Sequence, residues 1–187
     1  MKKNVLNVML VALVALVGVN VQAQEKVEIK KSKILWEGEK LTGSHDGDIQ
    51  LKEGFLLMEG GELVGGEFVV DMTTINVLDL EGDGKQKLEG HLNSDDFFGV
   101  NDHKTAKFVI NTVAKKGKTY GVSGTMTIKG KSNPIAFDLT MDEGQANTSF
   151  KIDRTKYNIR YGSGSFFDNL GDKTIYDDFK LDITLMF

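Results

Sequence analysis

The sequence has 187 residues, with 27 acidic and 23 basic side chains, so its formal net charge is −4. This mild acidity argues against the clustered basic surface that binds nucleic acid or anionic lipid headgroups. The chain contains no cysteine, which excludes disulfides, thiol catalysis and thiolate metal sites.

The first residues are typical of an export signal. Two lysines precede an apolar stretch at 8–19, and the Val-Gln-Ala triplet that ends at Ala23 places small or apolar residues at the two positions that determine cleavage. The stretch is shorter than the roughly 20 residues that span a bilayer, so we expect a removed signal peptide over 1–23 and no stable membrane insertion. Its loss would change the net charge from −4 to −6. We therefore expect a periplasmic or secreted protein with one domain over 24–187.

Alternating apolar and polar residues dominate the remaining sequence, as in strands with one buried and one solvated face. One proline and 21 scattered glycines are typical of a chain with many turns. About eight strands are expected from the alternating segments 33–41, 47–52, 55–59, 62–72, 105–113, 120–129, 135–141, 148–152 and 179–187. The runs at 120–129 and 135–141 should form a hairpin through the Gly130–Pro134 connection.

One segment, residues 84–100, departs from the two-residue alternation. Apolar residues from Leu88 to Phe98 follow helical spacing through polar neighbours, which predicts a short helix at 85–93. Ser94 begins a further turn, with two aspartates in favourable early positions. We expect this insertion to cover one end of the structure that the strands form.

Clean alternation indicates an antiparallel sheet with one solvated face, because parallel strands are covered on both faces. Eight such strands must also protect their edges, and a barrel removes edges altogether. We therefore predict a mainly β protein, an eight-stranded antiparallel β-barrel with one short helical insertion. A two-sheet sandwich is the alternative. The interior of such a barrel is either filled by side chains or large enough for one small ligand.

Candidate metal ligands do not form a recognised pattern. The string DLEGDG at 79–84 resembles the start of a calcium loop, but its twelfth position is Gly90 rather than glutamate. A solvated acidic turn is the better interpretation. The three histidines, whose spacings match no compact pair of zinc ligands, are His45, His91 and His103. We predict no metal site.

Catalytic motifs do not emerge either. The string GSGSFF at 162–167 lacks the strand-to-helix context of a nucleophile elbow, and nucleotide-binding signatures are missing. Adjacent carboxylates have diverging side chains, so they do not share a substrate. An enzyme would need His91, Asp95 and Arg154 to converge near one mouth of the barrel. We predict that the protein is not an enzyme.

Both arginines of the chain, Arg154 and Arg160, fall in one short stretch together with Asp153 and Tyr157. Arginine suits planar, bidentate pairing. One hypothesis is a structural ion pair or cation–π contact that holds a loop against the barrel. The other is a polar contact to a ligand headgroup at the mouth.

Two blocks of the sequence carry a family resemblance. They are HLNSDDFFGVNDHKTAKF at 91–108 and VSGTMTIKGKSNPIAFDL at 122–139. Their order and spacing resemble the YceI-like lipid/polyisoprenoid-binding family, with weaker similarity over most of the mature chain. His103-Lys104 stands where the family often has tyrosine-proline. The segment SHDGD at 44–48 makes the first strands shorter and richer in glycine than in better-known members.

The resemblance implies an extended, lipocalin-like barrel in the periplasm that holds an isoprenoid or other long apolar lipid, such as a quinone tail, without catalysis. It implies no cofactor other than such a bound isoprenoid lipid or quinone. The inward, ligand-contacting side chains would be Trp36, Phe68, Val70, Phe108, Ile110, Met126, Ile128, Phe137, Leu139, Phe150, Ile152, Phe179, Leu181 and Ile183. Expected contacts at the mouth are His91, Arg154 and Tyr157. The alternative is a filled barrel that acts as a structural or interaction module through its surface loops. The oligomeric state stays open, a homodimer included.

Overall fold

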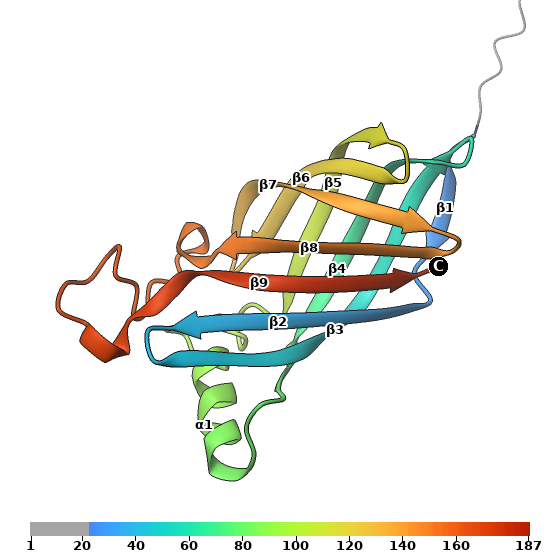
Figure 1. Cartoon of the computed structure of the whole chain (residues 1–187). Helices are drawn as coiled ribbons and strands as arrows, with labels where there is room; N and C mark the ends of the chain where they lie inside the picture. The colour runs from blue at the N-terminus through green and yellow to red at the C-terminus, as the bar shows by residue number, and fades with distance from the viewer. Residues whose placement is uncertain (1–22) are drawn as a thin grey trace, which may run out of the picture.

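The computed structural model describes residues 23–187, so nearly all of the predicted signal peptide lies outside the described residues. Figure 1 shows the chain from β1 in blue to β9 in red. The elements in chain order are β1 (Glu25–Glu28), β2 (Lys31–Lys40), β3 (Gly43–Glu59), β4 (Glu62–Val77), α1 (Gly82–Asn93), β5 (Thr105–Lys116), β6 (Thr119–Ile128), β7 (Lys131–Asp142), β8 (Gln145–Asp153), η1 (Arg154–Tyr157), η2 (Gly171–Lys173) and β9 (Ile175–Met186).

The eight strands β2 to β9 close into an antiparallel barrel. Their neighbour order is β3-β2-β9-β8-β7-β6-β5-β4, and β4 pairs back onto β3. This confirms the predicted eight-stranded barrel and excludes the sandwich. The strand β1, which the alternation did not predict, is a ninth. It pairs with β3 at Glu28↔Phe55, in the same register in which β2 pairs with β3 at Ile34↔Ile49.

The strand β3 corrects one prediction, since the segments 47–52 and 55–59 belong to a single strand. The register against β4 shifts between Leu51 and Glu53, which makes Lys52 an extra, bulged residue. Before the bulge, Leu51 faces the interior, whereas after it Leu56 does and is fully buried. The bulge therefore changes which residues face inward, and this break in alternation resembled the end of a strand.

The predicted β6–β7 hairpin is present, but its turn is shorter than expected. Lys129 and Gly130 have φ values of 49° and 69°, and Ile128 pairs with Lys131 on either side of them. Two consecutive positive φ values are those of a two-residue type I′ hairpin turn, in which glycine suits the second position. Pro134 therefore lies within β7 rather than in the connection.

Hydrogen bonding around the barrel is weakest between β7 and β8. These strands pair only at their hairpin, over Thr140–Asp142 and Gln145–Asn147. Counting from the turn, Pro134 occupies a non-hydrogen-bonded position opposite Thr125, so its missing N–H faces β8. We call the remaining length of this junction the β7–β8 seam.

The helix α1 begins three residues earlier than predicted and ends where predicted. Gly82, with a φ of +56°, turns the chain into the helix. The Lys85 ammonium donates to the Asn76 side chain at 2.7 Å, and the Glu89 carboxylate accepts the Val77 amide at 3.0 Å. These bonds fix α1 to the end of β4. Among residues 23–187, no helix is both long and apolar enough to cross a bilayer.

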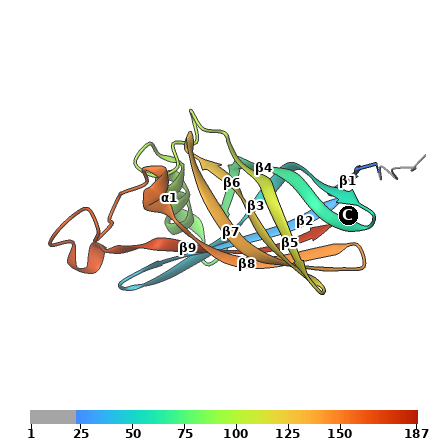
Figure 2. The same ribbon diagram turned by 90° about the horizontal axis from the view of Figure 1, so that it is seen from above.

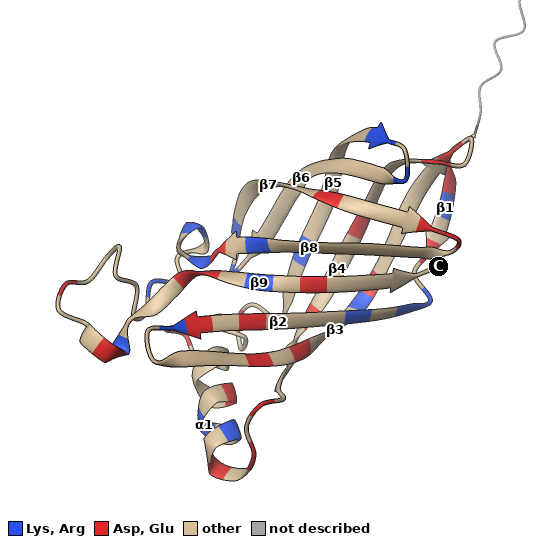
Figure 3. Ribbon diagram, viewed as in Figure 1, with Lys and Arg blue, Asp and Glu red and all other residues tan. Residues whose placement is uncertain are grey.

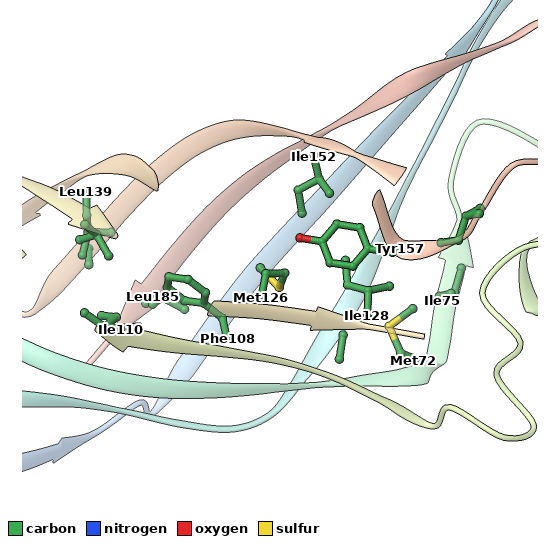
Figure 4. Close-up of a cluster of buried hydrophobic side chains, with 14 of the residues drawn as sticks. Met72, Ile75, Phe108, Ile110, Met126, Ile128, Leu139, Ile152, Tyr157 and Leu185 are labelled. Atoms are coloured by element: carbon green, nitrogen blue, oxygen red, sulfur yellow. The ribbon is translucent and has the colours of Figure 1, made fainter. Parts of the chain in front are cut away.

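The two ends of the barrel are built differently (Figure 2). The hairpin end carries the tight turns β3–β4, β5–β6 and β7–β8, whereas the loop end carries α1, η1, η2 and their connections. Side chains buried to 5% exposure or less fill the hairpin end, namely Leu56, Leu63, Tyr120 and Ala146. Figure 4 shows further buried side chains, from Ile110 and Leu139 to Met72 and Tyr157, that point into the barrel.

Candidate functional site: an apolar cavity inside the barrel

The barrel encloses a cavity of about 190 Å³, and its lining surface is almost entirely apolar. All fourteen inward-facing residues predicted from alternation line this cavity. Their contact with a ligand stays a prediction. The filled-barrel alternative requires packing from end to end, whereas the structure has a cavity that runs from the loop end to Leu139 and Leu185.

Phenylalanine rings form a continuous aromatic wall along one side of the cavity. Phe108 lies between Phe68 and Phe137, with ring centroids 6.5 and 5.2 Å away. Phe137 of β7 stacks on Phe150 of β8 at 4.2 Å, with the ring planes only 4° apart. This stacked pair joins the two strands across the β7–β8 seam, so side-chain packing closes the barrel where backbone hydrogen bonds do not.

Glycines on neighbouring strands make room for the large rings. A Cβ atom at Gly124 would lie 2.5 Å from the Phe108 ring, and a Cβ atom at Gly47 would lie 2.3 Å from the Trp36 ring. Neither separation is compatible with a side chain, so both positions require glycine. The Trp36 ring is held further by its Nε1, which donates to the Asp48 carbonyl at 3.1 Å.

The cavity reaches the loop end, where the predicted insertion covers part of it. Leu92 of α1 and the pair Phe97-Phe98 line the cavity at this end. This confirms that the insertion covers one end of the barrel. The edge-to-face contact between Phe98 and Phe179, at 6.3 Å, links the insertion to β9.

The mouth of the cavity lies at an irregular junction between β2 and β9. Gly38 pairs with Phe179 and Lys40 with Ile175, so three residues of β9 face the single residue Glu39. Glu39, Tyr176 and Asp178, which are exposed, border the cavity at this mouth. Bulges of this kind occur at barrel rims, where they redirect side chains.

Arg154, an expected mouth contact, is buried and bound to backbone. Only 1% of it is exposed. Its guanidinium donates to four carbonyls, those of Ile159, Tyr161, Ile175 and Tyr176, at 2.9 to 3.0 Å. Asp177 lies 3.6 Å away. These contacts agree with the hypothesis that the arginine holds a loop against the barrel. Arg154 also borders the cavity.

The carboxylate of Asp177 belongs to the same polar group. Burial disfavours its charged form, but hydrogen bonds from Ser163 and Ser165 and the charge of Arg154 outweigh this effect and lower its pKa. The Ser165 hydroxyl donates to Asp177 Oδ2 at 2.5 Å. The arrangement therefore keeps an anion beside the buried guanidinium.

His91 packs against aromatic rings at the loop end. Its ring lies 5.4 Å from Phe97 and 4.4 Å from Tyr161, and its Nε2 is buried with no hydrogen-bond partner among residues 23–187. Burial lowers the pKa of His91, Asp96 opposes this effect, and Arg154 adds to it. The imidazole is thus kept neutral, and it does not border the cavity.

The three residues of the enzyme hypothesis are arranged for other contacts. His91 and Arg154 pack on the same ring, Phe97, with the guanidinium 5.6 Å from the ring centroid. The side chain of Asp95 is exposed, and its backbone carbonyl accepts from Lys129 at 2.6 Å. Packing on an aromatic ring and bonding to carbonyls leave no donor and acceptor aligned for proton transfer.

Tyr157, the third expected mouth contact, lies deeper than predicted. It is almost fully buried, and its hydroxyl points toward Met126 and Ile152 (Figure 4). Burial raises the pKa of this phenol, and the charge of Asp153 acts in the same direction. The phenol therefore stays protonated, and it does not border the cavity.

The acidic string at 79–84 takes part in the β4–α1 connection. Asp79 accepts from the His45 ring at 2.7 Å and from the Asp46 amide at 3.2 Å. Within residues 23–187, no three histidine or carboxylate side chains are grouped closely enough to hold a metal ion.

Sequence reasoning missed part of the lining. Ile49 and Leu51 alternate in the predicted strand 47–52 and could have been assigned to the interior. Met72 and Ile75 could not, because they lie in a four-residue irregularity of β4 opposite Ile49. The sequence also gives no indication that the mouth is bordered by Glu39, Tyr176 and Asp178, because their position there depends on the β2–β9 bulge.

Comparison with solved structures shows the same fold in other proteins. The chain is similar to BcnA from Burkholderia cenocepacia, with a TM-score of 0.63 and 19% identity over 85% of this chain and 98% of that one. A polyisoprenoid binding domain from Saccharophagus degradans, implicated in plant cell wall breakdown, gives a TM-score of 0.59 and 13% identity over 88% and 97%. The YceI protein of Campylobacter jejuni gives 0.52 and 14% over 97% and 95%.

Sequence comparison points to the same group. A UPF0312 protein of Serratia proteamaculans is 34% identical over 74 residues, which are 40% of this chain and 38% of that protein. The similarity therefore spans less than two fifths of this relative's length. The family model described as the YceI-like domain matches residues 22–187. The chain belongs to the YceI-like domain family.

Proposed function

We propose that this protein is a periplasmic carrier that holds an isoprenoid chain, such as a quinone tail, in the hollow part of its barrel and catalyses no reaction. The observation that carries the proposal is the apolar cavity inside a closed barrel. The polyisoprenoid binding domain of Saccharophagus degradans, which shares the fold, supports the choice of ligand class.

The size of the cavity suits an apolar chain. A cavity needs roughly 10–15 Å³ to hold one water-sized group, so the cavity of about 190 Å³ holds roughly fifteen such groups. Burying one methylene contributes about 0.8 kcal/mol, and micromolar affinity needs about 8 kcal/mol. Ten to fifteen buried carbons therefore give useful affinity after the cost of association.

The ends of the barrel set the direction of the ligand. The hairpin end is filled by side chains, whereas the mouth at the loop end is bordered by Glu39, Tyr176 and Asp178. The tail should therefore enter the cavity and leave its headgroup at this mouth. Two carboxylates there, with Arg154 committed to backbone carbonyls, favour an uncharged headgroup.

The periplasmic location rests on the N-terminal export signal alone. Cell fractionation of the source bacterium checks this part of the proposal. A mature protein that begins at Gln24 in the periplasmic fraction supports it, and an unprocessed chain in the cytoplasm contradicts it.

Trp36 provides a direct test of ligand binding, because it is the single tryptophan of the chain and lines the cavity. Titration with menaquinone-4, a quinone with a C20 isoprenoid tail, should quench its fluorescence with a dissociation constant in the micromolar range. Organic extraction of gently purified protein, followed by mass spectrometry, should release an isoprenoid lipid. Absence of both results would contradict the proposal.

Two alanines on one strand give matched variants. Ala106 of β5 lines the cavity, whereas Ala114 of the same strand is exposed. Ala106→Phe should fill part of the cavity and weaken quinone binding at least tenfold, while Ala114→Phe should bind as the unchanged protein does. Circular dichroism establishes that both variants are folded, since overpacking can destabilise a core by about 1–3 kcal/mol.

A further inference from the structure

The connection between η1 and β9 exposes aromatic side chains beside the mouth of the cavity. We define the aromatic loop as residues 160–176, which include the first two residues of β9, Ile175 and Tyr176. Four of its rings are about half exposed, at 49% for Tyr161, 47% for Phe166, 50% for Phe167 and 45% for Tyr176. Figures 1 and 2 show the loop extending past the ends of the barrel strands. Several large apolar side chains exposed on one segment, rather than singly, are typical of an interaction site.

The exposed apolar side chains are distributed very unevenly over the molecule. Among residues 23–187, seven large apolar side chains are exposed. Met186 lies at the hairpin end, whereas Leu41, Leu78 and the four rings of the aromatic loop lie at the loop end. Six of the seven therefore lie at the end of the barrel that carries the mouth of the cavity.

The base of the aromatic loop is firmly held. The buried Arg154 guanidinium binds the carbonyls of Tyr161, Ile175 and Tyr176. Ser163 is fully buried, and its carbonyl accepts the amides of Phe166 and Phe167 at 3.2 and 3.0 Å. Both phenylalanines are therefore presented by a hydrogen-bonded turn, which fixes their outward position.

The aromatic loop is continuous with the cavity. Ile175 and Tyr176 belong to the loop and also line the cavity at its mouth. The amide of Leu41, in the β2–β3 turn, donates to the Thr174 carbonyl at 2.9 Å and brings a further exposed apolar side chain to the same place. A surface that covers the loop would therefore also face the mouth.

We propose that the aromatic loop docks on the surface of a phospholipid bilayer and places the mouth of the barrel against the lipid that supplies or receives the ligand. This inference rests on the proposed function, because an isoprenoid chain is stored in membranes rather than in water. Shallow insertion of aromatic and aliphatic side chains is how peripheral proteins bind the membrane interface. Tyrosine in particular favours the headgroup level.

The charges of the loop fit a bilayer surface. Arg160 and Lys173 balance Asp168 and Asp172, so the loop is neutral within a chain whose net charge is −4. Figure 3 shows that both positive and negative positions occur along it. The Arg160 guanidinium lies 4.5 Å above the Phe166 ring, which pairs a cation suited to phosphate with a ring suited to the acyl region.

The exposed area favours a membrane over a second copy of the chain. Full burial of an aromatic side chain covers about 150–250 Å², so four half-exposed rings offer roughly 400 Å². A stable protein interface buries about 800 Å² on each partner, which is twice as much. Membrane attachment through one small apolar element is weak and reversible, as a carrier that leaves again requires.

Vesicle sedimentation tests the proposal without any ligand. We expect the protein to bind phosphatidylcholine vesicles and the double variant Phe166→Ser with Phe167→Ser to bind at least tenfold more weakly. Met186→Ser removes an equally exposed apolar side chain at the hairpin end and should bind normally. Unchanged Trp36 emission shows that each variant is folded. Equal vesicle binding by the double variant and the unchanged protein, or no binding by either, overturns the proposal.

Ligand transfer separates docking from storage. With menaquinone-4 supplied in vesicles, Trp36 quenching should become at least tenfold slower in the double variant, whereas quinone added from ethanol should bind every variant with the same affinity. Failure of quinone to quench Trp36 under any condition overturns the proposed function, and vesicle binding still decides the docking. A concentration-dependent dimer that the double variant loses would assign the loop to self-association and overturn the membrane proposal.

Discussion

The two ends of the barrel are stabilised by different interactions. At the hairpin end, short turns bring apolar side chains such as Leu56 and Leu63 together with almost no exposed surface. At the loop end, the β2–β3 and β6–β7 turns are short, but the β4–β5 and β8–β9 connections are long. One buried cation, Arg154, holds the β8–β9 connection through backbone carbonyls. The hairpin end is closed by apolar packing, whereas the cavity has its mouth at the loop end. The hairpin end therefore mainly stabilises the barrel, and in the proposed function the loop end is the place of ligand exchange.

Substitution of Arg154 should have the largest effect. Arg154→Met removes the guanidinium from four carbonyls and from the Asp177 carboxylate, and loss of one partner of a buried charge pair costs about 3–5 kcal/mol. Hydrogen exchange should increase first in the loop end and only later in the strands of the hairpin end. Urea unfolding and exchange mass spectrometry measure both effects.

Arg160→Met is the matched control, because it removes the other arginine of the chain from an exposed position. Its free energy of unfolding should change by no more than about 0.5 kcal/mol. If the two variants were equally stable, the buried guanidinium would not be what holds the loop end together.

A cavity at the hairpin end should act on the whole barrel. Leu56 is fully buried, so Leu56→Ala should lower the free energy of unfolding by about 2–5 kcal/mol. Because it does not border the ligand cavity, quinone affinity of the folded protein should stay unchanged. Leu41→Ala, at an exposed position of the loop end, should leave stability nearly unchanged. A loss of quinone affinity in folded Leu56→Ala would show that the two ends are coupled.

The mouth should discriminate between headgroups. At about 8 Å in a water-like dielectric, two unit charges interact by about 0.5 kcal/mol. A diphosphate with about two negative charges forms four such pairs with Glu39 and Asp178, which should disfavour its binding by about 2 kcal/mol. Geranylgeraniol should thus bind more than tenfold more tightly than geranylgeranyl diphosphate, which carries the same C20 chain. Competition with menaquinone-4 for Trp36 quenching gives both affinities.

Neutral variants refine this prediction. Glu39→Gln with Asp178→Asn should improve diphosphate binding and leave the alcohol unchanged, whereas Asp142→Asn, at the β7–β8 turn of the hairpin end, should alter neither. Equal affinity for the alcohol and the diphosphate in the unchanged protein would mean that the mouth does not sense charge.

The residues that alternation identified correctly all lie in regular stretches of strand. Phe179, Leu181 and Ile183 alternate without interruption, and all three line the cavity as expected. Alternation failed where a bulge changes the register, as at Lys52 in β3 and at Glu39 opposite β9. A bulge depends on the partner strand and on closure of the barrel, so a local pattern does not contain it.

The polar residues of the loop end were harder to place. Their types indicated a special environment, and Arg154 is indeed buried. Whether it would meet a ligand or a carbonyl depends on the path of the connection from Asn158 to Thr174, which has no periodic pattern. The size of the cavity was equally inaccessible, because it depends on how Phe97 and Phe98 cover one end.

The smallest predicted effect is a pH dependence confined to the loop end. Burial lowers the pKa of His91 in the folded protein below its value in the unfolded chain, near 6.5. The unfolded state therefore takes up its proton first as the pH falls. The contribution of neutral His91 to stability is complete above pH 6.5 and decreases below it, until the folded protein is also protonated. Urea unfolding between pH 7.5 and 4.5 should show this decrease in the free energy of unfolding. His91→Gln should remove the part of the decrease that His91 causes. His103→Gln, which removes an imidazole elsewhere at the same end, should retain it. The same slope in His91→Gln as in the unchanged protein would show that another group causes the pH dependence.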